Sequence, residues 1–126
     1  MEDGKVAKAT TVDGYFDALD GPVQEIALAL RGRMHALGEG LTIALAWGYP
    51  SWSGQERILS IIAHSSRCNL QLFNGAQLAS AFAEIEGTGK SLRHVKVHTL
   101  ADVNARIDDI ILAAIALDSS APHRVR

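Results

Sequence analysis

The chain has 126 residues, of which 48% are hydrophobic and 21% are charged, and its formal net charge is −2. This length suits one domain, and this apolar fraction can build a hydrophobic core without disulfides, so a multidomain enzyme and a disordered chain are both excluded. A net charge so close to zero gives no general attraction to phosphate backbones or anionic lipids, so we expect neither a nucleic-acid nor a membrane partner.

Cysteine usage and apolar runs indicate a cytoplasmic protein. Cys68 is the single cysteine of the chain, so no internal disulfide can form. The first eleven residues lack the apolar core of a secretion signal. The longest aliphatic run, Ile110 to Leu117, is far shorter than the ~20 residues that cross a bilayer.

The first predicted elements are two helices. Residues 1–10 are polar and aperiodic and are expected to form a flexible tail. Thr11 is a suitable N-cap for a short helix, because apolar side chains follow it at helical spacing as far as Leu19. A second helix is predicted to begin at Asp20-Gly21-Pro22 and to end at Gly38, since proline fits a first helical turn and glycine fits the residue after a helix.

A meander of about four strands is predicted next. Residues 41–47 alternate with period two, and Gly48-Tyr49-Pro50 is expected to turn or distort the chain. A short strand is predicted at 51–53. The segment 58–64 would be apolar on both faces of a strand, which suits a central strand. A tight turn leads from it into the strand 68–73.

The last third of the sequence predicts a short helix, a strand and a long helix. Leu78, Phe82 and Ile85 mark one face of the short helix, and residues 91–99 alternate again as a strand. Thr99 and Asp102 have capping-box spacing before an amphipathic helix that extends to residue 117. Residues 118–126 are expected to form a second tail, which leaves 11–117 as one domain.

This order of elements, α-ββββ-α-β-α, predicts the α+β class. Long helices at both ends of a meander are expected to cover one face of an antiparallel sheet of about five strands. The open edge of such a sheet allows a homodimer, because edge strands carry unpaired backbone groups.

Three segments of the sequence are distinctive: Trp47-Gly48-Tyr49-Pro50, Asn69-Leu70 continuing to Gly75-Ala76-Gln77-Leu78, and Gly87-Thr88-Gly89-Lys90-Ser91-Leu92-Arg93-His94-Val95-Lys96. With the opening Thr11-Val12-Asp13-Gly14-Tyr15, they resemble the YdhG-like domain family, whose members are largely of unknown function. The resemblance covers roughly residues 11–117 and implies a small domain with helices packed on an antiparallel sheet. One branch of that family has been proposed to act as frataxin-like iron chaperones. Arg67-Cys68 stands where relatives often carry His-Val, so a role for that histidine does not transfer to this chain.

Three aromatic residues, Trp47, Tyr49 and Trp52, surround the Gly-Pro bend. Aromatic side chains beside an irregular turn can line a ligand pocket or anchor an interface, and they can equally pack beneath the helices. The leading hypothesis takes them as part of a recognition surface. The protein is then a binding module for a small molecule or a protein, without catalytic activity.

A cationic stripe is the second part of that predicted surface. Lys90, Arg93 and Lys96 follow the Gly87-Thr88-Gly89 loop with no acidic residue among them, so the stripe and the loop amides could hold a small anion. The loop is not a P-loop, because Glu84 occupies the position where that motif needs glycine and a strand follows instead of a helix.

Two alternative functions rest on other residues. Asp13, Asp17 and Asp20 are spaced to form an acidic ridge, as a frataxin-like iron-delivery protein would use, although acids near a helix start also complement its dipole. Cys68 and His64 bracket a short turn at a spacing that suits a nucleophile and its base, but Cys68 alternates with Leu70 and Leu72, which favours a core position. Iron in the first alternative is the only metal or cofactor that the sequence suggests.

Overall fold

The structure is a computed structural model that describes residues 9–120. Its elements are α1 (Val12–Asp17), α2 (Gly21–Leu37), β1 (Thr42–Ala46), β2 (Tyr49–Ser53), β3 (Arg57–Ala63), β4 (Cys68–Leu72), the 3-10 helix η2 (Gly75–Gln77), β5 (Arg93–Val97), the 3-10 helix η3 (Leu100–Asp102) and α3 (Ala105–Ser120). The predicted α+β class and order of elements are confirmed. Most of both predicted tails, residues 1–8 and 121–126, lies outside the described residues.

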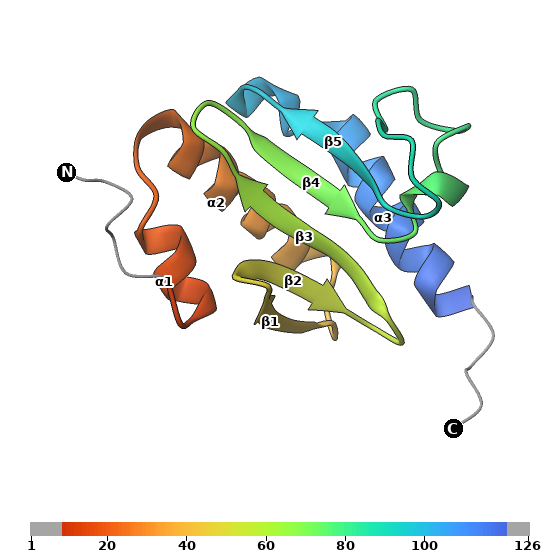
Figure 1. The fold of residues 1–126 in the computed structure, drawn as a ribbon, viewed down its shortest axis with the longest axis horizontal. Helices are drawn as coiled ribbons and strands as arrows, with labels where there is room; N and C mark the ends of the chain where they lie inside the picture. Colours follow the sequence, from red (N-terminus) through yellow and green to blue (C-terminus); the bar gives the residue numbers. More distant parts are fainter. Residues whose placement is uncertain (1–8, 121–126) are drawn as a thin grey trace.

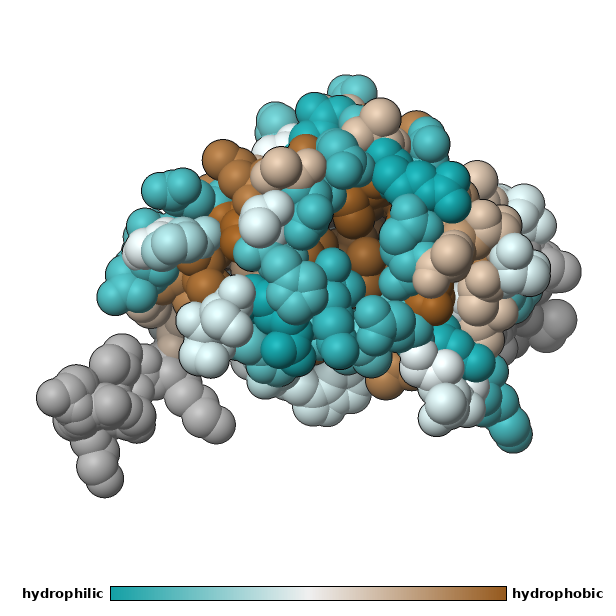
Figure 2. Space-filling model, turned by 90° about the horizontal axis from the view of Figure 1, so that it is seen from above, coloured by the Kyte–Doolittle hydropathy of each residue, from teal (hydrophilic) through white to brown (hydrophobic). Residues whose placement is uncertain are grey.

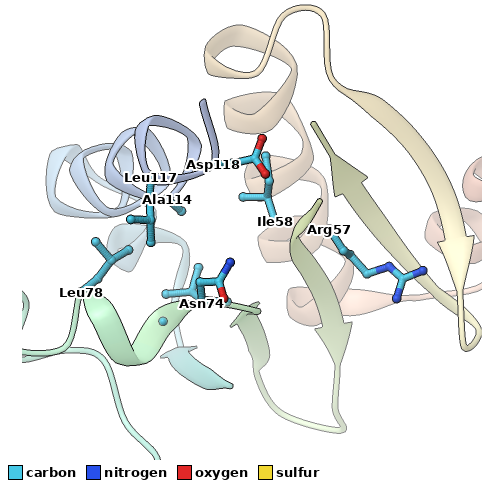
Figure 3. A pocket seen from close by; sticks show the side chains of 9 residues that line it. Arg57, Ile58, Asn74, Leu78, Ala114, Leu117 and Asp118 are labelled. Atoms are coloured by element: carbon cyan, nitrogen blue, oxygen red, sulfur yellow. The ribbon is translucent and has the colours of Figure 1, made fainter. Parts of the chain in front are cut away.

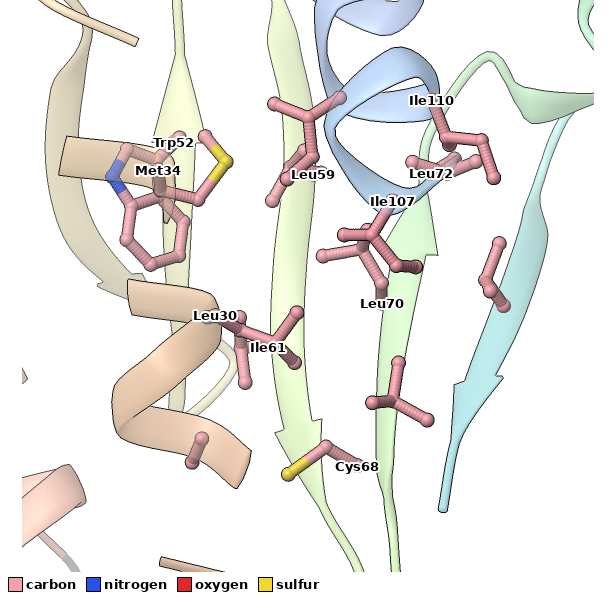
Figure 4. Close-up of a cluster of buried hydrophobic side chains, with 14 of the residues drawn as sticks. Leu30, Met34, Trp52, Leu59, Ile61, Cys68, Leu70, Leu72, Ile107 and Ile110 are labelled. Carbon is pink, nitrogen blue, oxygen red and sulfur yellow. The ribbon is translucent and has the colours of Figure 1, made fainter. Parts of the chain in front are cut away.

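The five strands form one sheet in the order β1-β2-β3-β4-β5, and every neighbouring pair is antiparallel. The helices α2 and α3 pack against one face of this sheet, and α1 lies at one end of the strands (Figure 1). The core fills the space between the sheet and the two long helices. Leu59, Ile61 and Leu70 project from the strands toward Leu30 of α2 and Ile107 of α3 (Figure 4).

The start of the fold follows the predicted caps closely. Thr11 is the N-cap of α1, and its hydroxyl accepts a hydrogen bond from the Gly14 N–H at 2.9 Å. Asp20 occupies the N-cap position of α2, but its side chain makes no capping bond. Gly38 follows the last residue of α2, as expected for a residue that ends a helix.

The first hairpin differs from the prediction in the position of its turn. Ala46 pairs with Tyr49, so the turn consists of Trp47 and Gly48, and β2 already includes Tyr49 and Pro50. Proline fits inside β2 because pairing with β3 begins only at Ser51, so no ladder bond to β3 is required from Pro50.

The chain between β4 and β5 contains one turn of 3-10 helix, η2, followed by turns, where a longer helical face was expected. Leu78, Phe82 and Ile85 nevertheless pack on the core, as their apolar character indicates. Close approach to β5 shapes this segment, because a Cβ atom added to Gly75 would lie 2.5 Å from the Cβ atom of Arg93. Tertiary packing has therefore replaced the α-helical geometry.

The end of the fold begins with the predicted capping box. Thr99 and Asp102 form it, but they cap η3, and the long helix starts only at Ala105. The side-chain oxygen of Asn104 accepts hydrogen bonds from the N–H groups of Arg106 and Ile107, which explains this start.

The helix α3 extends beyond the predicted boundary at residue 117 and ends at Ser120. Asp118 is buried, and its carboxylate accepts the N–H groups of Gln55 at 2.8 Å and Glu56 at 2.9 Å. The side chain points from the end of α3 toward Ile58, near the turn between β2 and β3 (Figure 3). Asp118 therefore ties the last turn of the helix to the sheet and belongs to the packed domain.

We expect Asp118→Ala to lower the free energy of unfolding by about 2 kcal/mol, because it removes a charged acceptor from two backbone N–H groups. Chemical denaturation monitored by circular dichroism measures the change. Asp109→Ala, an exposed aspartate of the same helix, is the control and should change stability by less than about 0.5 kcal/mol. Equal stability of the two variants would show that the anchor at Asp118 contributes nothing.

Candidate functional site

The turn between β1 and β2 holds a large apolar side chain in an unusual backbone conformation. Trp47 has φ of 51°, and it is the one residue other than glycine with positive φ in the part of the chain that the structure describes. Its side chain is 76% exposed. A bulky residue in the left-handed region costs about 1–2 kcal/mol, so the fold tolerates Trp47 at a position where glycine or asparagine would fit better.

A hollow of about 700 Å³ lies between this turn and α1. Tyr15, Ala18 and Leu19 come from α1 and the residues after it, and Trp47 and Tyr49 come from the hairpin. Ala9 and Gly48 complete the lining. None of these seven lining residues is charged, so the hollow suits an uncharged, largely apolar ligand.

Tyr15 is one of the two tyrosines that line this hollow. Its hydroxyl accepts the N–H of Ala63 at 3.0 Å, and its ring meets that of Tyr49 edge to face at 6.1 Å between centroids. Burial raises the pKa of the Tyr15 phenol, so the group stays protonated and keeps one O–H donor beyond the bond that it accepts from Ala63. Sequence reasoning placed Tyr15 only in the apolar stripe of the first helix, because nothing local indicates that α1 faces the hairpin.

The third aromatic residue of the bend, Trp52, belongs to the core. It is 1% exposed and lies beside Met34 of α2 (Figure 4). Side chains alternate along β2, so Trp52 points to the helix-covered face together with the buried Pro50. The expected group of three aromatic residues is therefore divided, and only Trp47 and Tyr49 line the hollow.

The exposed ring of Trp47 also makes a cation–π contact with Arg57. The Arg57 guanidinium lies 4.4 Å from the centre of the Trp47 ring and 5.7 Å from that of Phe73. Arg57 does not line the hollow. This contact packs a cation against the Trp47 ring, next to the hollow but outside its lining.

The predicted cationic stripe lies at the opposite edge of the sheet. Lys90 precedes β5, and Arg93 and Lys96 belong to it, whereas Trp47 and Tyr49 belong to the β1–β2 hairpin. Three strand spacings separate β2 from β5, which is about 14 Å between backbones. The structure therefore does not bring the aromatic and cationic residues together into the single recognition surface that the sequence predicted.

Two members of the stripe are also engaged by the protein itself. The Lys96 Nζ atom lies 3.4 Å from the Glu86 carboxylate, and the Arg93 guanidinium donates to the carbonyl groups of Gly89 and Leu92. Arg93 therefore fixes the glycine loop, and Glu86 partly neutralises Lys96. These contacts reduce the positive charge available to an anion.

The three aspartates do not converge on one point. Asp13 lies in α1 and pairs with Arg31 of α2 at 2.5 Å, while Asp17 is the last residue of α1 and Asp20 precedes α2. Among residues 9–120, no group of three or more His, Cys, Asp and Glu side chains is placed to hold a metal ion. The predicted acidic ridge is therefore not an assembled iron site.

The turn between β3 and β4 does not form the Cys-His pair that the spacing suggested. Cys68 is paired with Ala63, and the N–H of His64 bonds to the carbonyl of Arg67, so His64 lies across from Arg67. The Cys68 side chain is fully buried, and its Sγ atom donates to the carbonyl of Val23 at 3.8 Å. Burial raises the pKa of the thiol to about 11, so Cys68 has the properties of a core residue.

No protein-family model, curated protein or solved structure matches this chain. None of the helices in residues 9–120 is long and apolar enough to cross a membrane. The geometry of the hollow beside Trp47 is therefore the main basis for a functional proposal.

We expect Cys68 to resist alkylation in the folded protein. Iodoacetamide at pH 8 should modify it only after denaturant is added, because the native thiol is both buried and protonated. Mass spectrometry with and without denaturant measures the extent of modification. Rapid modification of the native protein would show that the thiol is accessible and would revive the Cys-His hypothesis.

The same thiol should make stability depend on alkaline pH. Folding raises its pKa from the ordinary value of 9.0 to about 11, so its contribution to stability is complete below pH 9 and is lost as pH rises toward 11. The free energy of unfolding of Cys68→Ala should therefore fall less steeply across this range than that of the wild type. Denaturation curves at several pH values measure both slopes, and equal slopes would contradict the raised pKa.

Proposed function

We propose that this protein is a binding module that holds a flat, uncharged ligand between α1 and the β1–β2 turn. One observation carries the proposal: Trp47 is exposed and is kept in a left-handed conformation at the edge of a large hollow. Backbone strain of this kind persists where surrounding structure maintains it, and it is concentrated at ligand sites.

The chemistry of the lining supports this class of ligand. Tyr15, Tyr49 and Trp47 offer ring faces and edges for stacking, and the volume of the hollow lies within the range of about 300–1,000 Å³ typical of small-molecule sites. The Tyr15 hydroxyl accepts the Ala63 N–H and retains its own hydrogen, which is the donor that this proposal assigns to the ligand. An anion would find no cationic partner in this lining, so the site and the cationic stripe are separate features.

The resemblance to the YdhG-like family adds support from sequence. The segment Trp47-Gly48-Tyr49-Pro50, on which that resemblance partly depends, forms the hairpin wall of the hollow. The opening segment that includes Tyr15 contributes the opposite wall. Two of the four segments that carry the resemblance thus meet at the hollow, while the other two lie in and around β4 and β5.

The test is the variant Trp47→Asn, which separates binding from folding. Uncharged bicyclic aromatic compounds are first screened against the wild type by thermal shift and tryptophan fluorescence. For a compound that binds, we expect Trp47→Asn to raise Kd at least tenfold, because a stacking surface is lost. We expect its Tm to be unchanged or higher, because Asn-Gly is the preferred pair for a two-residue hairpin turn.

Leu112→Asn is the matched control. Leu112 is an exposed apolar side chain of α3, outside the lining of the hollow, so this variant should bind as the wild type does. Tyr15→Phe should weaken binding to a smaller extent than Trp47→Asn, since it keeps the ring and removes only the hydroxyl. The proposal fails if no compound in the screen binds, or if Trp47→Asn binds with unchanged affinity.

A further inference from the structure

The two edges of the sheet differ in how they are protected. β5 carries Arg93, His94 and Lys96, and its outer side is bridged at His94 by two backbone hydrogen bonds to Glu86, at 2.8 and 3.0 Å. On the surface seen from above Figure 1, the side on which β5 lies, hydrophilic residues lie among apolar patches (Figure 2). Charges and a covering segment are the usual protection of an edge strand.

β1, at the other edge, carries no charged side chain, and no strand or β-bridge pairs with its outer side among residues 9–120. Its sequence is Thr-Ile-Ala-Leu-Ala, without a charged residue or a proline, and its register with β2 is continuous over all five residues. Ile43 is 42% exposed, and Ala44 is exposed as well. An uncharged, regular and apolar edge strand is a template for pairing with another strand.

The register of the hairpin determines which backbone groups are available. Ala46 and Tyr49 close a two-residue turn, so they form a hydrogen-bonded pair, and hydrogen-bonded and non-bonded pairs then alternate along the ladder. Ala46, Ala44 and Thr42 therefore direct their N–H and C=O groups toward β2. Ile43 and Leu45 direct theirs outward, to the open side of the edge.

We propose that β1 pairs with β1 of a second copy of this chain, antiparallel and with Ala44 on the two-fold axis. In this register Ile43 lies opposite Leu45 of the second copy, and Ala44 lies opposite Ala44. The outward groups of Ile43 and Leu45 then exchange hydrogen bonds in two symmetric pairs. The sheets of the two copies join into one continuous sheet of ten strands.

The side chains of β1 are compatible with this self-pairing. Ile43 and Leu45 lie on the helix-covered face, because Ile43 pairs with the core residue Trp52 and Leu45 pairs with the buried Pro50. The two-fold axis therefore brings four aliphatic side chains together on that face. On the other face only small side chains meet, and no charge faces a like charge, whereas two β5 strands would oppose cationic residues.

A second hollow, of about 550 Å³, provides surface beside β1 that a paired strand would cover. It lies beside β1, and its lining combines apolar side chains with the polar His35 and Glu39; the apolar ones include Ile43, Trp52, Met34 and Leu41. In the proposed register Leu45 of the second copy lies next to Ile43, at the rim of this hollow. Five paired residues are few compared with the roughly 800 Å² per partner of a standard interface, so burial of these side chains must contribute, and we expect a concentration-dependent dimer.

Charge complementation at the axis tests both the partner and the register. Sedimentation velocity of the wild type across a concentration series should show reversible dimers. Ala44→Lys and Ala44→Glu should each raise the dimer dissociation constant at least tenfold, because like charges then meet across the axis. An equimolar mixture of the two variants should recover dimers, since opposite charges now face each other.

Ala116→Lys, an exposed alanine of α3, is the control and should dimerise as the wild type does. Circular dichroism should show that all three variants remain folded, because Ala44 is exposed in the described chain. A wild type that stays monomeric up to millimolar concentration overturns the proposal and leaves β1 as an edge for a different strand. Dimers that persist in Ala44→Lys, or a mixture that does not recover them, overturn the register.

Discussion

The packing of α2 and α3 against one face of the sheet is the constraint on which the other features of this fold depend. Leu30 and Met34 of α2, and Ile107 and Ile110 of α3, occupy the same buried cluster as the strand residues (Figure 4). Arg33 joins the two helices through a pair of hydrogen bonds to Asp108, each of 2.8 Å. Because strand residues alternate between faces, this packing decides which side chains are buried and which stay available.

The β1–β2 hairpin shows how this constraint produces a site. Trp52 and Pro50 are buried by their position in β2, whereas Trp47 and Gly48 form the turn that precedes this strand and are exposed. α1 reaches this end of the sheet through the bond between Tyr15 and the backbone of Ala63. The hollow is the space that these two connections leave between α1 and the turn, so its walls come from segments more than 25 residues apart in sequence.

Sequence reasoning succeeded where a signal is local. The capping residue Thr11 and the glycine that ends α2 were identified because caps depend on neighbouring backbone groups. Reasoning from sequence was less accurate where a distant segment competes with local preference. The close contact of Gly75 with Arg93 determines the backbone path before Leu78. The hydrogen bond from the Gln55 N–H to Asp118 anchors the end of α3 to the β2–β3 turn. Neither contact can be predicted from the residues next to it in the sequence.

The sequence by itself determined the α+β class and the order of the elements, and it favoured a core position for Cys68 on an alternating strand, because periodicity and caps act over a few residues. It also drew attention to Trp47 and Tyr49 as candidate site residues. Only the tertiary structure decided that Trp52 is a core residue and that Tyr15 faces Tyr49. It also decided that Lys90 and Lys96 lie at the edge of the sheet opposite to the β1–β2 hairpin. The physical reason is that strand order and the placement of helices on a sheet are set by the burial of one shared apolar core.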